Sequence, residues 1–151
     1  MNLPNSGPAA VVERLLVAVN AHDLDGMVSC FAEDYVNEAP LHPLRGFKGN
    51  KQVRANWALI FASVPDLRAR LPRTAVDGDT LWTEWDISGT RTDGTEFLMG
   101  GVVIFGVTGT VITSARFYLD AVEGTGGDVN AHVRQVAGTT TSSAGAAGAT
   151  S

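Results

Sequence analysis

The hydrophobic pattern of this chain changes its period once, at Pro65, and that change limits the folds open to it. Before Pro65, apolar residues recur at intervals of three and four, as in Val53, Trp57, Ile60 and Val64, which is the spacing of a helix face. After Pro65, apolar and polar residues alternate, which is the spacing of a β-strand. The sequence therefore predicts helices first and a sheet afterwards, an arrangement of the α+β class.

Three amphipathic helices are expected in the first part of the chain. Residues 8–21 carry apolar side chains at helical spacing, and Asp23 is a suitable N-cap for a second, shorter helix. A third helix is expected to follow Asn50, which also has the chemistry of a cap. Between them, "YVNEAP" at 35–40 is typical of a short strand and "LHPLRGFKG" of a loop.

Four strands follow, and short turns separate them. The turn sequences are "DGD" at 77–79, "TDGT" at 92–95 and "TGT" at 108–110, so the strands are expected to pair as an antiparallel meander. Gly100 and Gly101 lie in the middle of a strand, where glycine permits a bend. The prediction is a strongly curved antiparallel sheet wrapped around three N-terminal helices and enclosing a cone-shaped cavity.

The length and composition fit one domain with its own core. The chain has 151 residues, of which 44% are hydrophobic. We expect a flexible N-terminus over 1–8, an α+β domain over 9–123 and a weakly ordered tail over 124–151, with a possible short helix in "DVNAHVRQV". The end of that tail is of low complexity.

Charge and cysteine content exclude several classes of partner. The net charge is −5 and no block of basic residues is long, so neither nucleic acid nor a membrane is expected as a partner. Cys30 is the single cysteine and the N-terminus lacks a signal-peptide pattern, which is compatible with a cytoplasmic protein. Three scattered histidines have no ligand spacing, so we predict no metal, and no cofactor motif is present.

The segment "YVNEAP" places polar groups on both faces of a strand. Tyr35, Asn37 and Ala39 share one face, whereas Val36 and Glu38 share the other. We expect the phenol and the amide to face the cavity and Glu38 to lie at its rim or in solvent. The alternative is a buried tyrosine and asparagine that bind the backbone and have a structural role only.

Two carboxylates of the second long strand are the main chemical signal. Glu84 and Asp86 share a face with Trp82, whereas Trp85 and Ile87 lie on the other face. In a pocket the two acids would raise the pKa of one of them, which suits a general acid. The alternative places both acids in solvent while Trp85 and Ile87 pack on the helices. We interpret the first face as the cavity face.

The order of elements and three stretches of sequence resemble a known superfamily. "VNAHDLDGMVSCFAEDYV", "RGFKGNKQV" and "GTVITSARFYLD" are similar to the nuclear transport factor 2-like fold and its SnoaL-like group over residues 9–122. The resemblance implies a cone with a small-molecule cavity and a homodimer. A dimer is also expected because Thr83, Trp85 and Ile87 would form an apolar outer face. This fold hosts isomerases, cyclases, epoxide hydrolases and binding modules.

Particular residues resemble those of enzymes on this fold. "YVNEAPLHPLRG" is similar to the Tyr-x-Asn segment of limonene-epoxide-hydrolase-like enzymes, which implies that Tyr35 and Asn37 help to hold a water molecule. "TEWD" is similar to the Arg-x-Asp strand, so Asp86 matches the acid that protonates the epoxide oxygen, with Glu84 in place of the arginine. The aspartate base of these enzymes, and of SnoaL-like polyketide cyclases, falls near Phe117.

Two further positions depend on alignment and register. Ketosteroid-isomerase-like proteins carry a carboxylate base in the early segment, where this chain has Asn37 or Glu38. On the last strand, Arg116 and Asp120 alternate with Phe117, so they face away if Phe117 faces the cavity. A shift of one residue would instead make Asp120 a catalytic candidate.

These observations favour a cofactor-free enzyme that acts on a small apolar molecule by proton transfer, through isomerisation, cyclisation or epoxide opening. Asp86 is the expected acid, Glu84 its partner or the base, and Tyr35 and Asn37 the groups that position water or a substrate oxygen. The residues expected to bind the substrate are Trp82, Phe117, Trp57, Met99 and His42. The alternative is a non-catalytic ligand-binding or dimerisation module, which Phe117 in place of an aspartate favours.

Overall fold

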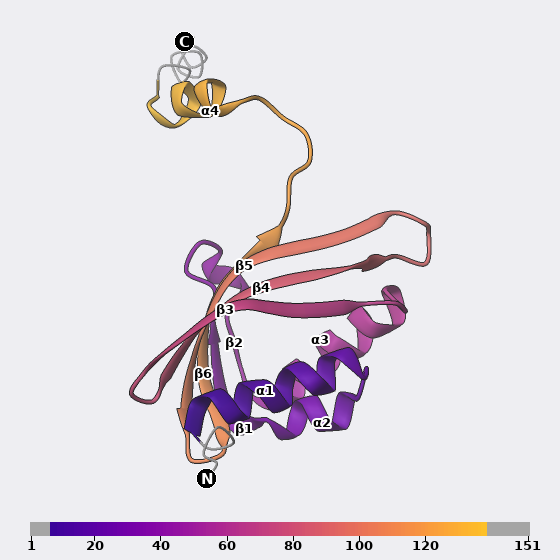
Figure 1. Cartoon of the computed structure of the whole chain (residues 1–151), viewed down its shortest axis with the longest axis vertical. Helices are drawn as coiled ribbons and strands as arrows, with labels where there is room; N and C mark the ends of the chain where they lie inside the picture. The colour runs from indigo at the N-terminus through magenta and orange to yellow at the C-terminus, as the bar shows by residue number, and fades with distance from the viewer. Residues whose placement is uncertain (1–6, 139–151) are drawn as a thin grey trace.

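An open, curved sheet of six strands carries three helices on one face (Figure 1). The structure is a computed structural model and describes residues 7–138. The three helices are α1 (Gly7–Asn20), α2 (Leu24–Ser29) and α3 (Asn50–Ser63). The predicted α+β class, with helices before the long strands, is confirmed.

The apolar face of α1 forms much of the core beneath the sheet. Its buried side chains are Val11, Val12, Leu15, Ala18 and Val19, which recur at intervals of three and four as a helix face requires. They form one hydrophobic cluster with buried side chains of the strands. The helical period that the sequence shows therefore corresponds to burial.

The caps of the two following helices differ from each other. The Asp23 carboxylate accepts a hydrogen bond of 3.0 Å from the N–H of Gly26, which caps α2 as predicted. The prediction that Asn50 caps α3 is wrong, because Asn50 is the first helical residue and Gly49 precedes it with φ of +94°. The Asn50 amide instead donates to the carbonyl O of Phe31 and ties α3 to β1 (Phe31–Glu38).

The sheet has the order β2-β1-β6-β5-β4-β3. Its remaining strands are β2 (Phe47–Lys48), β3 (Arg68–Asp77), β4 (Thr80–Thr90), β5 (Glu96–Thr108) and β6 (Val111–Ala121). The four long strands pair antiparallel with one another, as the turn sequences predict. The sheet is not antiparallel throughout, because β1 pairs parallel to β6.

Glycines hold the turns and allow one close approach within the sheet. Gly78, Gly94 and Gly109 occupy the predicted turns with φ of 62°, 88° and 63°. In mid-strand, Gly101 has φ of 139°, and a Cβ there would overlap the backbone carbonyl O of Tyr118 on β6. Only glycine therefore fits where β5 and β6 approach each other at this bend.

Beyond β6, the chain leaves the sheet and forms a separate short helix, α4 (Val129–Val136), which lies apart from the domain (Figure 1). The Asp128 carboxylate caps it by accepting from the N–H of Ala131. None of its side chains is buried. The possible helix expected in this segment is confirmed, whereas the expectations for residues 1–6 and 139–151 lie outside the described residues. No helix within 7–138 is long and apolar enough to cross a membrane.

Candidate functional site

A pocket of about 350 Å³ opens between α3, β1 and the helix-covered face of the sheet. Most of its wall is aromatic or aliphatic, and the main contributors are Phe31, Val53, Trp57, Ile87, Met99 and Phe117. A deeper cavity of about 30 Å³ shares Phe31, Trp57, Ile87 and Phe117 with it and continues toward the core. The space has the size and apolar character of a small-molecule site.

Polar side chains enter this pocket from β1 and from the segment that follows β1. They are Tyr35, Asn37, His42 and Arg45, together with Asn56 of α3. No Asp or Glu of the described chain lines the pocket. Any hydrogen bonds to a ligand therefore come from neutral or cationic groups.

Tyr35 and Asn37 are joined by a hydrogen bond inside the pocket. The alternation of β1 puts both on one face, and the Tyr35 hydroxyl donates to Oδ1 of Asn37 over 2.7 Å. Tyr35 is 1% exposed, and its ring makes edge contacts with Phe31 and Phe47 at 4.7 and 5.9 Å between centroids. Burial raises the pKa of the Tyr35 phenol far above its usual value, so the hydroxyl keeps its proton.

The side-chain amide of Asn37 has an unpaired hydrogen-bond donor within residues 7–138. Its Oδ1 accepts from Tyr35, whereas its Nδ2 has no hydrogen-bond partner among the residues that the structure describes. Since no fully buried side-chain nitrogen or oxygen of residues 7–138 lacks a partner, this nitrogen keeps some exposure, and Asn37 is one of the residues that line the pocket. Asn37 thus offers N–H groups to an oxygen of a bound molecule.

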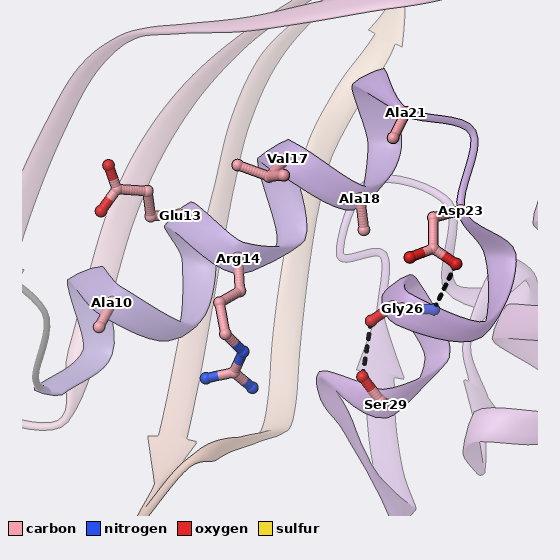
Figure 2. A pocket seen from close by; sticks show the side chains of 9 residues that line it. All are labelled: Ala10, Glu13, Arg14, Val17, Ala18, Ala21, Asp23, Gly26 and Ser29. Atoms are coloured by element: carbon pink, nitrogen blue, oxygen red, sulfur yellow. Dashed lines mark hydrogen bonds between the residues drawn. The ribbon is translucent and has the colours of Figure 1, made fainter.

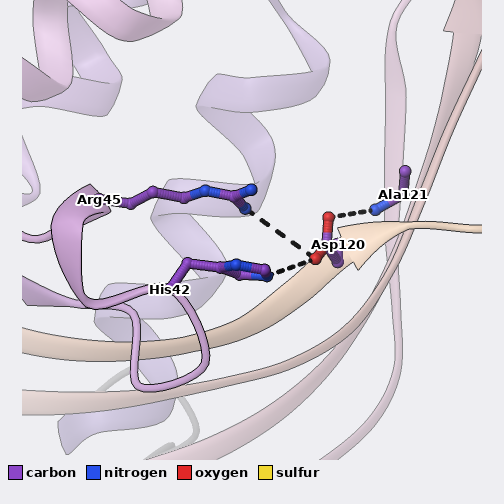
Figure 3. A network of polar contacts seen from close by, with 4 residues as sticks. All are labelled: His42, Arg45, Asp120 and Ala121. Atoms are coloured by element: carbon purple, nitrogen blue, oxygen red, sulfur yellow. Dashed lines mark hydrogen bonds and ion pairs between the residues drawn. The ribbon is translucent and has the colours of Figure 1, made fainter. Parts of the chain in front are cut away.

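His42 brings an imidazole to the edge of the pocket. It lies on the segment between β1 and the short 3-10 helix η2 (Pro43–Arg45), and its Nε2 is 2.9 Å from Oδ2 of Asp120 at the end of β6 (Figure 3). Nη1 of Arg45 lies 3.9 Å from the same oxygen, and the N–H of Ala121 donates to Oδ1. The Ala121 N–H and then His42 lower the pKa of the Asp120 carboxyl, which stays ionised.

Glu84, Asp86 and Trp82 do not face the pocket, so their expected placement is wrong. On β4 the buried side chains are Leu81, Thr83, Trp85 and Ile87, and the intervening residues lie on the opposite face. Asp86 pairs there with Arg70, and Glu84 lies 3.8 Å from Arg73.

The polar atoms on the two faces of β4 explain which face is buried. The indole N–H of Trp85 donates to Oγ1 of Thr83 over 2.8 Å, and the Thr83 hydroxyl donates to the carbonyl O of Val103 over 2.7 Å. These groups are satisfied when buried, whereas two buried carboxylates would lose their hydration. Because Thr83, Trp85 and Ile87 point inward, they form no apolar outer face for a dimer.

The other sequence-derived positions lie at the pocket. Tyr35, Asn37, His42, Trp57, Met99 and Phe117 all line it. Glu38 lies outside and forms an ion pair with Arg116 at 2.7 Å, as expected for a rim residue. The register with Phe117 facing inward is confirmed, since Phe117 and Leu119 line the pocket and Arg116 bonds on the other face.

Sequence reasoning did not assign several contributors to the site, among them the lining residues Asn56 and Phe97 and one contact at the pocket edge. Asn56 lies three residues after Val53 and four before Ile60, so the helical spacing carried a signal for it. Phe97 shares the strand face of Met99. The contact between His42 and Asp120 had no sequence signal, because 78 residues separate the two.

A larger but more open groove lies between α1 and α2 (Figure 2). Apart from Glu13, which is exposed on α1, its charged and hydroxyl side chains have partners within the protein. Asp23 accepts from Gly26, Ser29 donates to the Gly26 carbonyl O, and Arg14 donates to the carbonyl O of Thr110. The groove therefore offers little chemistry of its own. No three His, Cys, Asp or Glu side chains within 7–138 lie close enough together to hold a metal ion.

The family model for the SnoaL-like domain matches residues 12–115. The chain belongs to this SnoaL-like family. No curated protein matches the sequence. Solved structures share the fold of this SnoaL-like protein at low sequence identity, under 25% for each of those compared below.

A Mycobacterium tuberculosis protein in complex with estradiol-17β-hemisuccinate superposes with a TM-score of 0.65 and 22% identity, over 75% of this chain and 93% of that one. An epoxide hydrolase of the limonene-epoxide-hydrolase-like type from the same organism gives a TM-score of 0.63 and 21% identity, over 74% and 80%. A putative isomerase from Bacillus subtilis superposes with a TM-score of 0.66 and 14% identity, over 75% of this chain and 86% of that one.

Proposed function

We propose that this SnoaL-like protein binds a small, largely apolar organic molecule in the 350 Å³ pocket and acts on it by proton transfer without a cofactor. Isomerisation, ring closure and epoxide opening are reactions of this type. The observation that carries the proposal is the hydrogen-bonded pair of Tyr35 and Asn37 within an otherwise apolar wall. A similar fold in an epoxide hydrolase and in a putative isomerase supports it.

The polar pair supplies a place for one oxygen of the substrate. The accessible N–H groups of Asn37 donate to that oxygen, and the neutral Tyr35 hydroxyl fixes the amide in this orientation. In this largely apolar pocket, these dipoles stabilise negative charge that develops on the oxygen as a proton leaves a neighbouring carbon. The hydrocarbon part of the molecule packs against Trp57 and Phe117.

Binding without catalysis is a second candidate, and one observation favours it. No carboxylate of residues 7–138 lines the pocket, and Phe117 lines it near the position where the resemblance to limonene-epoxide-hydrolase-like enzymes and SnoaL-like polyketide cyclases implies an aspartate base. In this version the same oxygen-binding pair holds a ligand that leaves unchanged.

The test of the shared step is binding of 2-acetylnaphthalene, an apolar molecule with one carbonyl oxygen, measured by tryptophan fluorescence. We expect saturable binding that Asn37→Ala weakens about fivefold, since one hydrogen bond contributes about 1 kcal/mol. Met99→Trp should abolish binding because the larger ring fills the pocket.

Asp86→Asn, on the opposite face of the sheet, is the matched control and should bind as the unaltered protein does. Equal affinity of all these variants would place the ligand outside the pocket and overturn the proposal.

We also propose that the protein is a homodimer through the outer face of the sheet and that it works in the cytoplasm. On that face Trp82 pairs with Ile104 and Val102 with Tyr118 on neighbouring strands, and Trp82 is 47% exposed. This apolar strip supports a dimer in place of the residues expected from the sequence. The cytoplasmic setting rests on Cys30, which is free and buried.

A further inference from the structure

We propose that His42 is the proton acceptor of this pocket and that Asp120 is the residue that positions it. The inference rests on the proposed function and names the base that the proton transfer needs. Three titratable side chains of the described chain line the pocket, namely Tyr35, His42 and Arg45. Of these three kinds of side chain, an imidazole is the one that can accept a proton, because a guanidinium has no free lone pair and the buried phenol of Tyr35 keeps its proton.

The contact with Asp120 selects the tautomer of the neutral imidazole. Nε2 of His42 lies 2.9 Å from Oδ2 of Asp120, and a carboxylate accepts hydrogen bonds, so Nε2 carries the proton. The lone pair then lies on Nδ1, the nitrogen that accepts the substrate's proton. When it does so, the imidazolium forms beside a negative charge that stabilises it.

The carboxylate is itself held in place by two neighbours. The N–H of Ala121 donates to Oδ1 of Asp120 over 2.9 Å, which leaves Oδ2 for His42 (Figure 3). Nη1 of Arg45 lies 3.9 Å from Oδ2 and is the other charged group beside this oxygen among residues 7–138. Because its pKa is lowered, the Asp120 carboxyl stays ionised across the pH range in which imidazoles titrate.

The arrangement joins elements that are remote in sequence. His42 and Arg45 belong to the segment after β1, whereas Asp120 ends β6, the strand that pairs parallel to β1. The parallel pairing brings the end of β6 alongside the segment that leaves β1. A purely structural contact would tie the two segments together without affecting a proton transfer, so the test must separate these roles.

A suitable probe is 5-nitrobenzisoxazole, a small apolar heteroaromatic that reports a base directly. Nδ1 of His42 takes the proton from C3, the C3–H electron pair completes the nitrile, and the N–O bond breaks. The electron pair of that bond stays on oxygen as a phenolate, which the Asn37 N–H groups can bind. The product, 2-cyano-4-nitrophenolate, is an isomer of the deprotonated reactant and is coloured, so no other reagent is needed.

The experiment compares the rate of this elimination across variants and pH. We expect His42→Ala to lower the rate at least about tenfold, since a positioned base contributes about 10²-fold or more. We expect Asp120→Asn to lower it severalfold and to move the acid limb of the pH profile to lower pH, because the negative charge that favours the imidazolium is gone. Asp120→Glu, which restores that charge, should recover part of the rate and of the profile.

Asp86→Asn, an exposed acid on the outer face, is the control and should behave as the unaltered protein. Circular dichroism establishes that every variant is folded. Rates in His42→Ala equal to the unaltered protein, or a pH profile unmoved by Asp120→Asn, would overturn the inference.

Binding of 2-acetylnaphthalene by the same variants separates the two proposals. If 2-acetylnaphthalene binds but the elimination rate is independent of His42, only the assignment of the base fails. If 2-acetylnaphthalene does not bind in the pocket at all, the proposed function fails.

Discussion

The Tyr35 hydroxyl donates a hydrogen bond of 2.7 Å to Oδ1 of Asn37, two residues along the same strand, and so occupies the amide's oxygen while its N–H groups have no partner within residues 7–138. This relationship fixes which end of the Asn37 side chain a ligand meets. A ligand oxygen is favoured at that point, because an N–H group faces it. The hydroxyl is therefore as important for specificity as the amide that contacts the ligand.

Tyr35→Phe should destabilise the protein by about 1–3 kcal/mol, because it leaves Oδ1 of Asn37, a residue that is 8% exposed, without its donor. The measurement is urea unfolding followed by circular dichroism. Tyr118→Phe is the matched control, because Tyr118 lies on the outer face, and should change the free energy of unfolding by less than about 0.5 kcal/mol. An equal effect of both variants would contradict the structural basis of this prediction.

The phenol of Tyr35 should resist ionisation for as long as the protein is folded. Its pKa is raised by burial, so its contribution to stability is fully present below the ordinary tyrosine value of about 10 and is lost as the pH rises above it. The chain has two tyrosines, so Tyr118→Phe leaves Tyr35 as the single phenol.

In that variant, phenolate absorbance should appear only at the alkaline pH at which the circular dichroism of the fold is lost. Absorbance that rises while the fold persists would mean that Tyr35 is open to solvent.

Gly101→Ala should destabilise the domain by about 3 kcal/mol, since strained backbone costs about 1–3 kcal/mol and the new Cβ also overlaps the Tyr118 carbonyl. Thermal and urea unfolding measure the loss. Gly124→Ala is the control, because nothing lies within 4 Å of a Cβ at that position. A loss no larger than that of the control would mean that β5 and β6 can move apart at this bend at little cost.

Trp82→Arg should convert the proposed dimer to a monomer, because it puts a charge in the middle of the apolar strip on the outer sheet face. Analytical ultracentrifugation at micromolar concentration measures the change. Val129→Arg alters another exposed apolar side chain, on α4, and should leave the dimer intact. An unaltered protein that sediments as a monomer would rule out the dimer itself.

The sequence alone determined the kinds of elements and several features of the site. The spacing of apolar residues distinguishes helices from strands, because each element must bury one face. The glycine-containing turns fix how the long strands connect. The same alternation put Tyr35 and Asn37 on one face of β1. It also put Phe117 and Arg116 on opposite faces of β6. These are local consequences of strand geometry and need no knowledge of the rest of the fold.

Only the tertiary structure decided which face of β4 is buried. Trp82 lies on one face and Trp85 on the other, so hydrophobicity along the strand favours neither. The choice follows from neighbours: Thr83 and Trp85 find hydrogen-bond partners inside, whereas Glu84 and Asp86 find arginines of β3 outside. Likewise, His42 meets Asp120 only because β1 and β6 pair in parallel, which brings together residues that are 78 positions apart. Alternation assigns residues to faces, but the packing of distant segments decides what each face meets.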